Sequence, residues 1–209
     1  MSGFHHLHAI FSSLQGEGRN AGRPATFIRY CTCNLSCKWC DTHKNEKMVL
    51  STQEVVGQVM QHRNRTVVIT GGEPTIQPGL DELLVALRAA KRWIALETNG
   101  VVAPRHPELF DYIAVSPKAD FAARYVDGTM LQQADEVRIV ATSEEIVPFC
   151  RLMRQRIQAK NYYISPLEKD GKMHYRRAMT LQRRLNHLEP ELLPPWCLSV
   201  QMHKVLGIR

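Results

Sequence analysis

Short apolar runs alternate with amphipathic stretches along most of this chain, and this alternation restricts the possible folds more than any other feature. Strands are predicted at residues 25–30, 66–70, 93–96, 112–115, 136–140, 161–164 and 198–202. Helices are predicted from Ser51, which opens a capping box, to about Arg63, and over residues 80–92, 143–160 and 173–188. Strands alternating with helices predict parallel β-α-β units. We therefore expect an α/β fold, an open or partial (β/α) barrel of about six units, too few for a closed eightfold barrel.

The length of 209 residues suits one domain and allows a sizeable core without disulfides. We therefore predict a single domain over residues 1–209. No uncharged apolar run reaches the roughly 18–20 residues of a membrane span. Residues 1–6 lack the basic and apolar regions of a signal peptide, so the expected location is cytoplasmic.

The formal net charge of +7 bears on possible partners. The basic residues are scattered, apart from a denser stretch around Arg176-Arg177 and Arg183-Arg184. No aromatic residues alternate with that stretch, so a solvated helix face is favoured over a nucleic-acid groove, and neither nucleic acid nor membrane is expected as a partner. The positive field suits an anionic small substrate or an acidic protein partner.

Polar signatures follow five of the predicted strands. They cover residues 33–42, 71–74, 97–100, 116–118 and 165–167. The carboxyl ends of parallel strands meet at one edge of the fold, where open and closed α/β barrels bind their ligands. The sequence therefore predicts one site made by several loops at this edge.

Six cysteines are present, and Cys31, Cys33, Cys37 and Cys40 fall within ten positions. Such a cluster is typical of metal binding or redox chemistry rather than disulfides. Zinc would normally take four ligands, and Cys31 or His43 would then join the other three. A [4Fe–4S] cluster bound by Cys33, Cys37 and Cys40 alone would leave one iron open for another ligand. Cys31, Cys150 and Cys197 are interpreted as packing residues.

The Cys-x3-Cys-x2-Cys loop after one strand and Gly71-Gly72-Glu73-Pro74 after the next resemble the radical S-adenosylmethionine (SAM) superfamily. The resemblance implies that the open iron binds SAM, which is reductively cleaved to a hydrogen-abstracting radical. Glycines at residues 71 and 72 agree with this, since they let backbone approach a ligand closely.

Motifs along nearly the whole chain resemble the 7-carboxy-7-deazaguanine synthase family of queuosine and deazapurine biosynthesis. They are Leu14-Gln15-Gly16-Glu17-Gly18, Arg29, Cys40-Asp41-Thr42, Ser116-Pro117-Lys118, Gln201-Met202-His203-Lys204 and Leu206-Gly207-Ile208. The resemblance implies a homodimeric lyase that converts 6-carboxy-5,6,7,8-tetrahydropterin into 7-carboxy-7-deazaguanine with loss of ammonia. It implies a [4Fe–4S] cluster, SAM and Mg²⁺ as cofactors. A flavodoxin- or ferredoxin-type protein is the expected electron donor, to which the positive charge is suited.

The same resemblance assigns roles to individual residues. Cys33, Cys37 and Cys40, on a loop spanning about 31–43, bind the cluster, and Thr42 binds Mg²⁺. SAM contacts fall on Gly72, Ser116, Pro117, Lys118, Ser165, Pro166, Leu167 and Glu168. Substrate contacts fall on Leu14, Gln15, Gly16, Arg29, Thr70, Glu97, His203 and Arg209, the last two in a covering tail over about 198–209.

Residue chemistry supports two of these roles independently. The fork of an arginine such as Arg29 binds a carboxylate through two hydrogen bonds, and a carboxylate such as Glu97 accepts from a guanine-like edge of N–H donors. The alternatives are a surface strand residue for Arg29, a cap or ion-pair partner for Glu97, a packing residue for His203 and a turn residue for Thr42.

Two other functions are considered. An activating enzyme for a glycyl radical partner also carries the cysteine motif and an Asn-Gly pair, but lacks the Gln-Gly-Glu-Gly segment. An iron–sulfur electron carrier or zinc-binding module would leave the polar strand ends unexplained.

Overall fold

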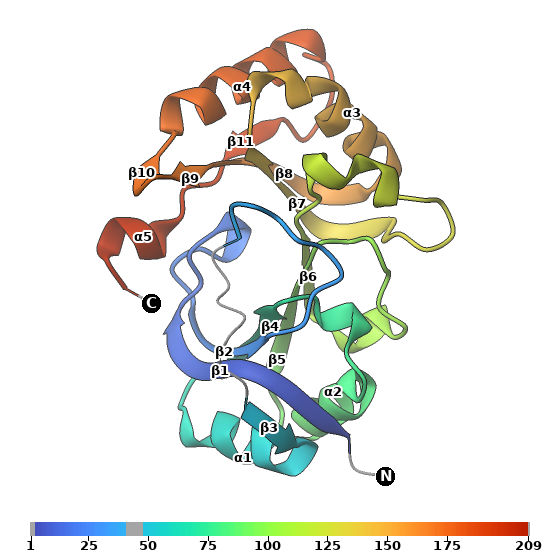
Figure 1. Cartoon of the computed structure of the whole chain (residues 1–209), viewed down its shortest axis with the longest axis vertical. Coiled ribbons are helices and arrows are strands. Elements are labelled where there is room, and N and C mark those ends of the chain that lie inside the picture. The colour runs from blue at the N-terminus through green and yellow to red at the C-terminus, as the bar shows by residue number, and fades with distance from the viewer. Residues whose placement is uncertain (1–2, 41–47, 209) are drawn as a thin grey trace.

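The computed structural model describes residues 3–40 and 48–208, in which nine strands form one curved sheet (Figure 1). The sheet order is β11-β8-β7-β6-β5-β4-β2-β1-β3. Its strands are β1 (Phe4–Leu14), β2 (Pro24–Tyr30), β3 (Met48–Ser51), β4 (Thr66–Gly71), β5 (Trp93–Thr98), β6 (Tyr112–Val115), β7 (Gln133–Ala141), β8 (Gln158–Pro166) and β11 (Trp196–Leu198). A separate hairpin joins β9 (Glu168–Lys169) to β10 (Lys172–Met173).

The neighbouring strands from β2 to β11 are all parallel, whereas β1 is antiparallel to both β2 and β3. The helices are α1 (Thr52–Gln61), α2 (Leu80–Ala89), α3 (Val147–Arg156), α4 (Tyr175–Leu188) and α5 (Met202–Leu206). Short 3-10 turns, Pro107–Leu109 and Ala119–Arg124, occupy the two connections on either side of β6. The predicted open, mostly parallel α/β barrel is therefore confirmed, with helices missing from these two connections.

The two faces of the sheet bury different sets of side chains. On the outer face, Leu83 and Leu87 of α2 belong to a large core with Ile69 of β4 and Leu96 of β5. On the inner face lies a smaller apolar cluster made of Ala9, Phe11, Ala25, Phe27, Val68 and Ala95. Successive side chains of a strand point to opposite faces, so one strand supplies both sets.

The same alternation places polar residues on the inner face near the carboxyl ends of the strands. Arg29 follows the inner-face Phe27 by two residues, Thr70 follows Val68, and Glu97 follows Ala95. Arg29 and Thr70 are also paired across β2 and β4.

The N-terminal strand β1 and the short β3 were not among the predicted strands. Leu7, Ala9 and Phe11 of β1 are buried in alternation, but His5, at the next position on the same side, interrupts this apolar pattern in the sequence. His5 is itself completely buried, and its ring nitrogens form hydrogen bonds with Tyr30 Oη (2.9 Å) and Thr52 Oγ1 (3.0 Å). A polar residue with buried partners thus occupies a position on the buried side of the strand, where the pattern predicts an apolar side chain.

The predicted last strand at residues 198–202 is wrong. The strand is Trp196–Leu198, and residues 202–206 form α5. Asn186 of α4 fixes the strand by bonding both the backbone N–H (2.8 Å) and carbonyl (2.9 Å) of Trp196. The backbone N–H of Met202 then donates to Gly16 O (2.8 Å), which turns the tail away from the sheet.

The predicted helix over residues 143–160 is too long. A 3-10 turn covers Glu144–Ile146, α3 covers Val147–Arg156, and β8 already begins at Gln158. Pairing with β7 decides this boundary, because Gln158 and Ala159 lie opposite Gln133 and Ala134. No helix among residues 3–40 and 48–208 has the length and apolarity needed to cross a membrane.

Candidate functional site

A cavity of about 530 Å³ opens at the carboxyl ends of the parallel strands. Its lining includes these predicted residues: Leu14, Gln15, Gly16, Arg29, Cys33, Cys37, Cys40, Thr70, Gly72, Glu97, Ser116, Lys118, Ser165, Pro166, Leu167, Glu168 and His203. Pro117 lies between Ser116 and Lys118 in the sequence, but it does not line the cavity. Thr42 and Arg209 lie outside the residues that the structure describes. The predicted convergence of separate loops on one edge is thus observed.

The three cysteines of the motif reach this cavity from the loop after β2. Cys33 and Cys37 are half-buried and Cys40 is exposed. The backbone N–H of Leu35 donates to Cys33 Sγ (3.4 Å). Burial raises the pKa of the Cys37 thiol, and the nearby Lys118 ammonium partly opposes this. Cys31 is buried, its thiol bonds to His6 O (3.3 Å), and it does not line the cavity.

The Gly-Gly segment after β4 holds the start of the cysteine loop through the backbone. The N–H groups of Gly72 and Glu73 donate to Tyr30 O and Thr32 O, each at 2.8 Å. A Cβ atom on Gly72 would lie 2.0 Å from Thr32 O, so only glycine permits this approach. Gly72 therefore sets the distance between this segment and the loop that carries Cys33.

Glu73, the acid of the same motif, is completely buried and joins β4 to β5. Its carboxylate accepts from Thr75 N (3.1 Å) and Thr75 Oγ1 (2.9 Å), and also from Thr98 Oγ1 (2.6 Å) and Asn99 N (2.7 Å). Burial raises the pKa of Glu73, and these donors oppose the increase. Its position indicates a structural role, since it does not line the cavity.

Lys118 and Ser116 form one side of the cavity. Lys118 Nζ donates to Ser116 Oγ (2.8 Å) and lies 5.1 Å from the ring centre of Trp39, on the cysteine loop. Burial lowers the pKa of Lys118. Trp39 Nε1 donates to Asp120 Oδ2 (3.2 Å), so the cysteine loop is attached to the segment after β6.

The end of β8 forms another side, with Ser165, Pro166 and Leu167. Ser165 is 2% exposed, and its hydroxyl has no hydrogen-bond partner within the described part of the chain. Such a buried orphan facing a cavity is typical of a ligand contact. Glu168 forms an ion pair with Lys204 of α5.

Arg29, Thr70 and Glu97 lie on neighbouring strands of the cavity floor. Arg29 Nε is buried without a partner in residues 3–40 and 48–208, and the guanidinium lies 5.4 Å from the ring centre of Phe11. Thr70 Oγ1 donates to Glu97 Oε2 (3.2 Å), and Gln15 Nε2 donates to Glu97 Oε1 (2.8 Å). The floor thus presents a guanidinium with bonding capacity on one strand and a carboxylate two strands away.

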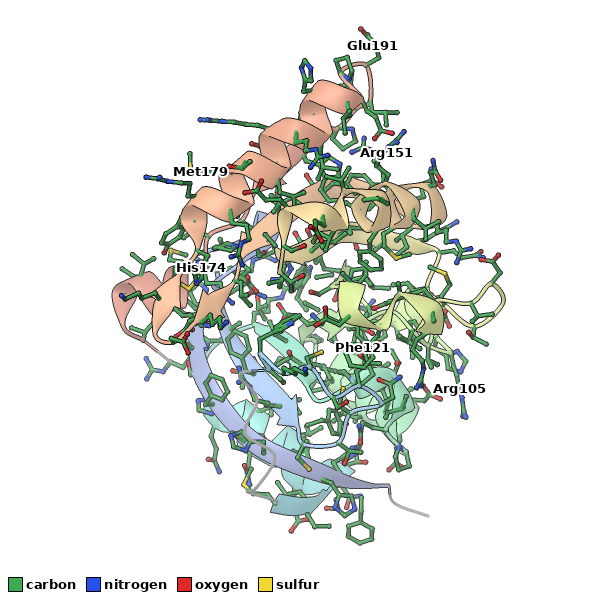
Figure 2. The ribbon with its side chains drawn as sticks, turned by 45° about the horizontal axis from the view of Figure 1, so that its top comes forward. Arg105, Phe121, Arg151, His174, Met179 and Glu191 are labelled. Atoms are coloured by element: carbon green, nitrogen blue, oxygen red, sulfur yellow. The ribbon has the colours of Figure 1, made fainter. Side chains whose placement is uncertain are left out.

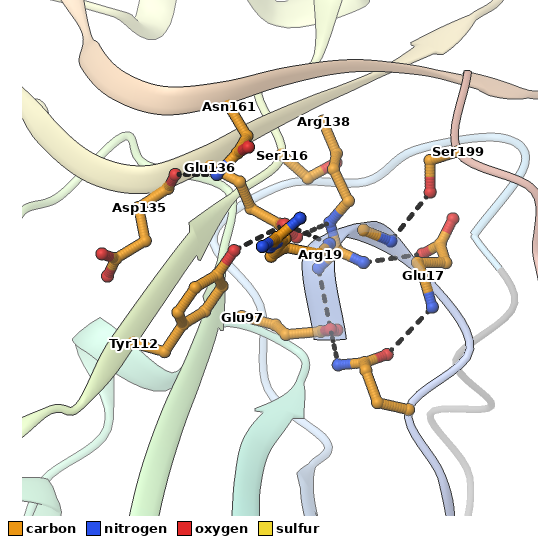
Figure 3. Close-up of polar contacts among 12 residues, drawn as sticks. Glu17, Arg19, Glu97, Tyr112, Ser116, Asp135, Glu136, Arg138, Asn161 and Ser199 are labelled. Atoms are coloured by element: carbon orange, nitrogen blue, oxygen red, sulfur yellow. Dashed lines mark hydrogen bonds and ion pairs between the residues drawn. The ribbon is translucent and has the colours of Figure 1, made fainter. Parts of the chain in front are cut away.

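Arg138 of β7 is a cavity residue that the sequence analysis did not identify. Its guanidinium forms ion pairs with Glu17 (3.1 Å), Glu97 (2.7 Å) and Glu136 (3.0 Å), as Figure 3 shows. Burial alone would raise the pKa of Glu97, but Arg138, Gln15 and Thr70 lower it to about 2. The available signal was the alternation Glu136, Arg138, Val140, which places charged residues on the inner face of a buried strand.

The tail closes one side of the cavity. Besides the bond from Met202 to Gly16, the N–H of Gly18 donates to Ser199 Oγ (2.9 Å). His203 packs so closely against Gly16 that a Cβ atom on residue 16 would lie 2.0 Å from His203 Nδ1. Gln201, His203 and Lys204 of this segment line the cavity.

The residues present suit a cluster and SAM by their chemistry. Cys33, Cys37 and Cys40 reach one cavity from one loop, although no three His, Cys, Asp or Glu side chains among the described residues are placed to hold a single metal ion. Gly72, the buried Ser165 hydroxyl and the Lys118 ammonium line the remaining volume. A thiolate-rich loop suits iron–sulfur ligation. The arrangement can bind an anionic, flat ligand beside a redox-active centre.

Comparisons with known proteins agree with this geometry. Residues 27–158 match the family model described as Radical SAM superfamily. The chain is 45% identical to 7-carboxy-7-deazaguanine synthase of Neisseria meningitidis serogroup B and 44% identical to that of Haemophilus influenzae, covering 95% of this chain and 92% of each relative. The fold is similar to the crystal structure of QueE from Escherichia coli, with a TM-score of 0.72 and 22% identity over 96% of this chain and 95% of that one.

Replacing Gly72 by Ala should displace the cysteine loop, because the new methyl group would overlap Thr32 O. We expect at least a severalfold loss of bound iron and sulfide after anaerobic reconstitution, measured chemically and by the visible spectrum. Gly57→Ala is the matched control, since residue 57 lies inside α1 with nothing within 4 Å of the added Cβ. That variant should keep its iron and gain about 0.5–1 kcal/mol in stability. Normal iron content in Gly72→Ala would contradict the proposed constraint.

Proposed function

The chain belongs to the 7-carboxy-7-deazaguanine synthase family of the radical SAM superfamily, and we propose that its cavity converts 6-carboxy-5,6,7,8-tetrahydropterin into 7-carboxy-7-deazaguanine with loss of ammonia. The enzyme is a radical SAM lyase with a [4Fe–4S] cluster and SAM as cofactors. The observation that carries the choice of substrate is that Arg29 and Glu97 both line the floor beside the cysteine loop, two strands apart.

Cys33, Cys37 and Cys40 would hold the cluster, which together with SAM supplies a radical able to abstract hydrogen. Ser116, Lys118 and the segment from Ser165 to Glu168 would surround SAM. Ser165 would donate or accept through the hydroxyl that has no protein partner in the described residues.

Arg29 and Glu97 would orient the substrate. They lie on β2 and β5, which are separated by β4, so their backbones are about two strand spacings or ~10 Å apart. That separation suits a two-ring molecule with a carboxylate at one end and an N–H edge at the other. Arg29 would bind the carboxylate and Glu97, kept ionised, would accept from the pyrimidine edge.

Parts of the proposal rest on the resemblance alone. Mg²⁺ would be held by Thr42 together with substrate oxygens, and Arg209 would approach the substrate; both residues lie outside the described ranges. A homodimer, a flavodoxin- or ferredoxin-type electron donor and a cytoplasmic location are likewise proposed. An activating enzyme for a glycyl radical partner is not favoured, since the relatives cover nearly the whole chain under one name.

The direct test of function is turnover. The reconstituted enzyme, given SAM, a reductant and carboxytetrahydropterin without oxygen, should form the deazaguanine product, detected by mass spectrometry. Cys33→Ala, Cys37→Ala and Cys40→Ala should each abolish turnover and the cluster absorbance, because each removes one of three ligands. Cys31→Ala is the control and should retain both. Loss of the cluster in Cys31→Ala, with survival in Cys33→Ala, would refute the ligand assignment.

Replacing Arg29 by Ala should weaken substrate binding about 100-fold, since a charge-assisted pair in a closed site contributes a few kcal/mol and each ~1.4 kcal/mol is tenfold. SAM binding should change little. Arg88→Ala is the control, because Arg88 pairs with Asp111 on the outer side of the sheet. Equal losses of substrate and SAM affinity in Arg29→Ala would instead assign Arg29 to the fold.

Thr42→Val keeps the shape of the side chain and removes its oxygen. Because Mg²⁺ requires oxygen ligands, turnover and its stimulation by Mg²⁺ should both fall, while the cluster spectrum and SAM binding remain. A titration of turnover against Mg²⁺ gives the answer. A full magnesium response in this variant would show that the metal is bound elsewhere.

A further inference from the structure

The guanidinium of Arg138 forms ion pairs with three carboxylates from three segments of the chain. Arg138 lies on β7 and is 4% exposed. Its partners are Glu17 in the loop after β1, Glu97 on β5 and Glu136, two residues away on its own strand (Figure 3). An arginine can do this because its planar fork carries five N–H donors, whereas a lysine presents one compact charge.

The three carboxylates differ in their access to the cavity. Glu136 is 2% exposed and also accepts from Tyr112 Oη (2.8 Å) and the backbone N–H of Arg19 (2.8 Å), so it is committed to the protein. Glu17 and Glu97 have side chains 21% and 23% exposed, and both line the cavity. Arg138 therefore connects a buried anchor to two carboxylates that face the ligand.

Glu97 retains capacity for one more donor. Its Oε1 accepts from Gln15 and Arg138, whereas Oε2 accepts from Thr70 alone among the residues described. A carboxylate oxygen has two lone pairs, so Oε2 can accept a further N–H from the cavity.

We propose that Arg138 is a positioning residue that holds Glu97 and Glu17 in fixed orientation toward the N–H edge of the substrate. Without its charge, three carboxylates would share a buried region, where like charges and burial favour protonation. A protonated Glu97 would no longer offer a carboxylate to paired N–H donors. The inference rests on the proposed function, because it assigns a partner to the substrate's pyrimidine edge.

The test compares substrate binding with pH in matched variants. Arg138→Met keeps much of the volume and removes the charge. Arg151→Met is the control, because Arg151 lies on α3, toward the top of Figure 2, and pairs with Glu189 away from the cavity. The probe is 6-carboxypterin, whose fluorescence reports binding to the reconstituted, SAM-loaded protein.

The carboxylates paired with Arg138 are Glu17, Glu97 and Glu136, and Tyr112 is bonded to Glu136. Arg138 also interacts electrostatically with Tyr163 and Lys118. Arg29, Lys118 and His203 line the same cavity. His203 and the other groups are common to both proteins, so the ratio of variant to wild-type Kd isolates the effect of Arg138. The wild-type carboxylate of Glu97 stays ionised throughout the neutral range.

We expect Arg138→Met to raise Kd by about tenfold or more near pH 7, and the ratio to fall severalfold as pH rises from about 6 to 7.5, because Glu97 regains its charge. SAM binding and the cluster spectrum should persist. Arg138→Lys should be intermediate, since it keeps a charge but not the fork. Arg151→Met should match the wild type.

A ratio near one at every pH, or a raised ratio that does not change with pH, would overturn the proposal. If Arg138→Met does not fold, Arg138→Lys decides. A wild-type Kd in that variant would overturn the positioning role, and a raised Kd would support it, because lysine keeps the charge and lacks the fork. Failure of the wild-type protein to bind 6-carboxypterin or to turn over carboxytetrahydropterin would instead refute the proposed function. The two failures are therefore distinguishable.

Discussion

The whole site depends on the alternation of side chains along the parallel strands, in which every second residue points to the same face of the sheet. Residues 27 and 29 of β2, 68 and 70 of β4, and 95 and 97 of β5 each put an apolar side chain below a polar one on the inner face. The residues between them, such as Ile69 and Leu96, complete the outer core. A slip of one residue in any strand would exchange these sets, so the register that builds the core also builds the cavity.

The cysteine loop depends on a second constraint, which acts through backbone. Gly72 lies against Thr32 with no room for a side chain, and Glu73, completely buried, gathers four donors from the ends of β4 and β5. Neither contact involves a cysteine. Together they fix where the chain leaves β2, and hence where Cys33 enters the cavity.

The cavity floor carries a positive group at one side and carboxylates at the other. Arg29 carries a donor without a described partner on β2, whereas Glu17, Glu97 and Glu136 surround Arg138 toward β7. An anionic substrate with an N–H edge can match this arrangement in one direction only. The tail closes one side of the cavity, because His203 packs against Gly16 and Lys204 forms an ion pair with Glu168.

The sequence by itself determined the parallel α/β class and the cysteine loop, and every described residue that it predicted for the site, except Pro117, lines the cavity. These features are local: apolar runs have a period, cysteines have a spacing, and strand ends carry polar residues. The sequence did not reveal β1, because its buried His5 is stabilised by hydrogen bonds with Tyr30 and Thr52. It also did not reveal where α3 ends and β8 begins, because pairing with β7 decides that boundary. Arg138 was hidden for the same reason. The role of a charged residue in an apolar strand cannot be inferred until its ion-pair partners are known. The partners of Arg138 lie 2, 41 and 121 residues away along the chain. Only the tertiary structure brings them together, because ion pairs form through space. The alternation Glu136, Arg138, Val140 indicates the face on which Arg138 lies, but not its partners.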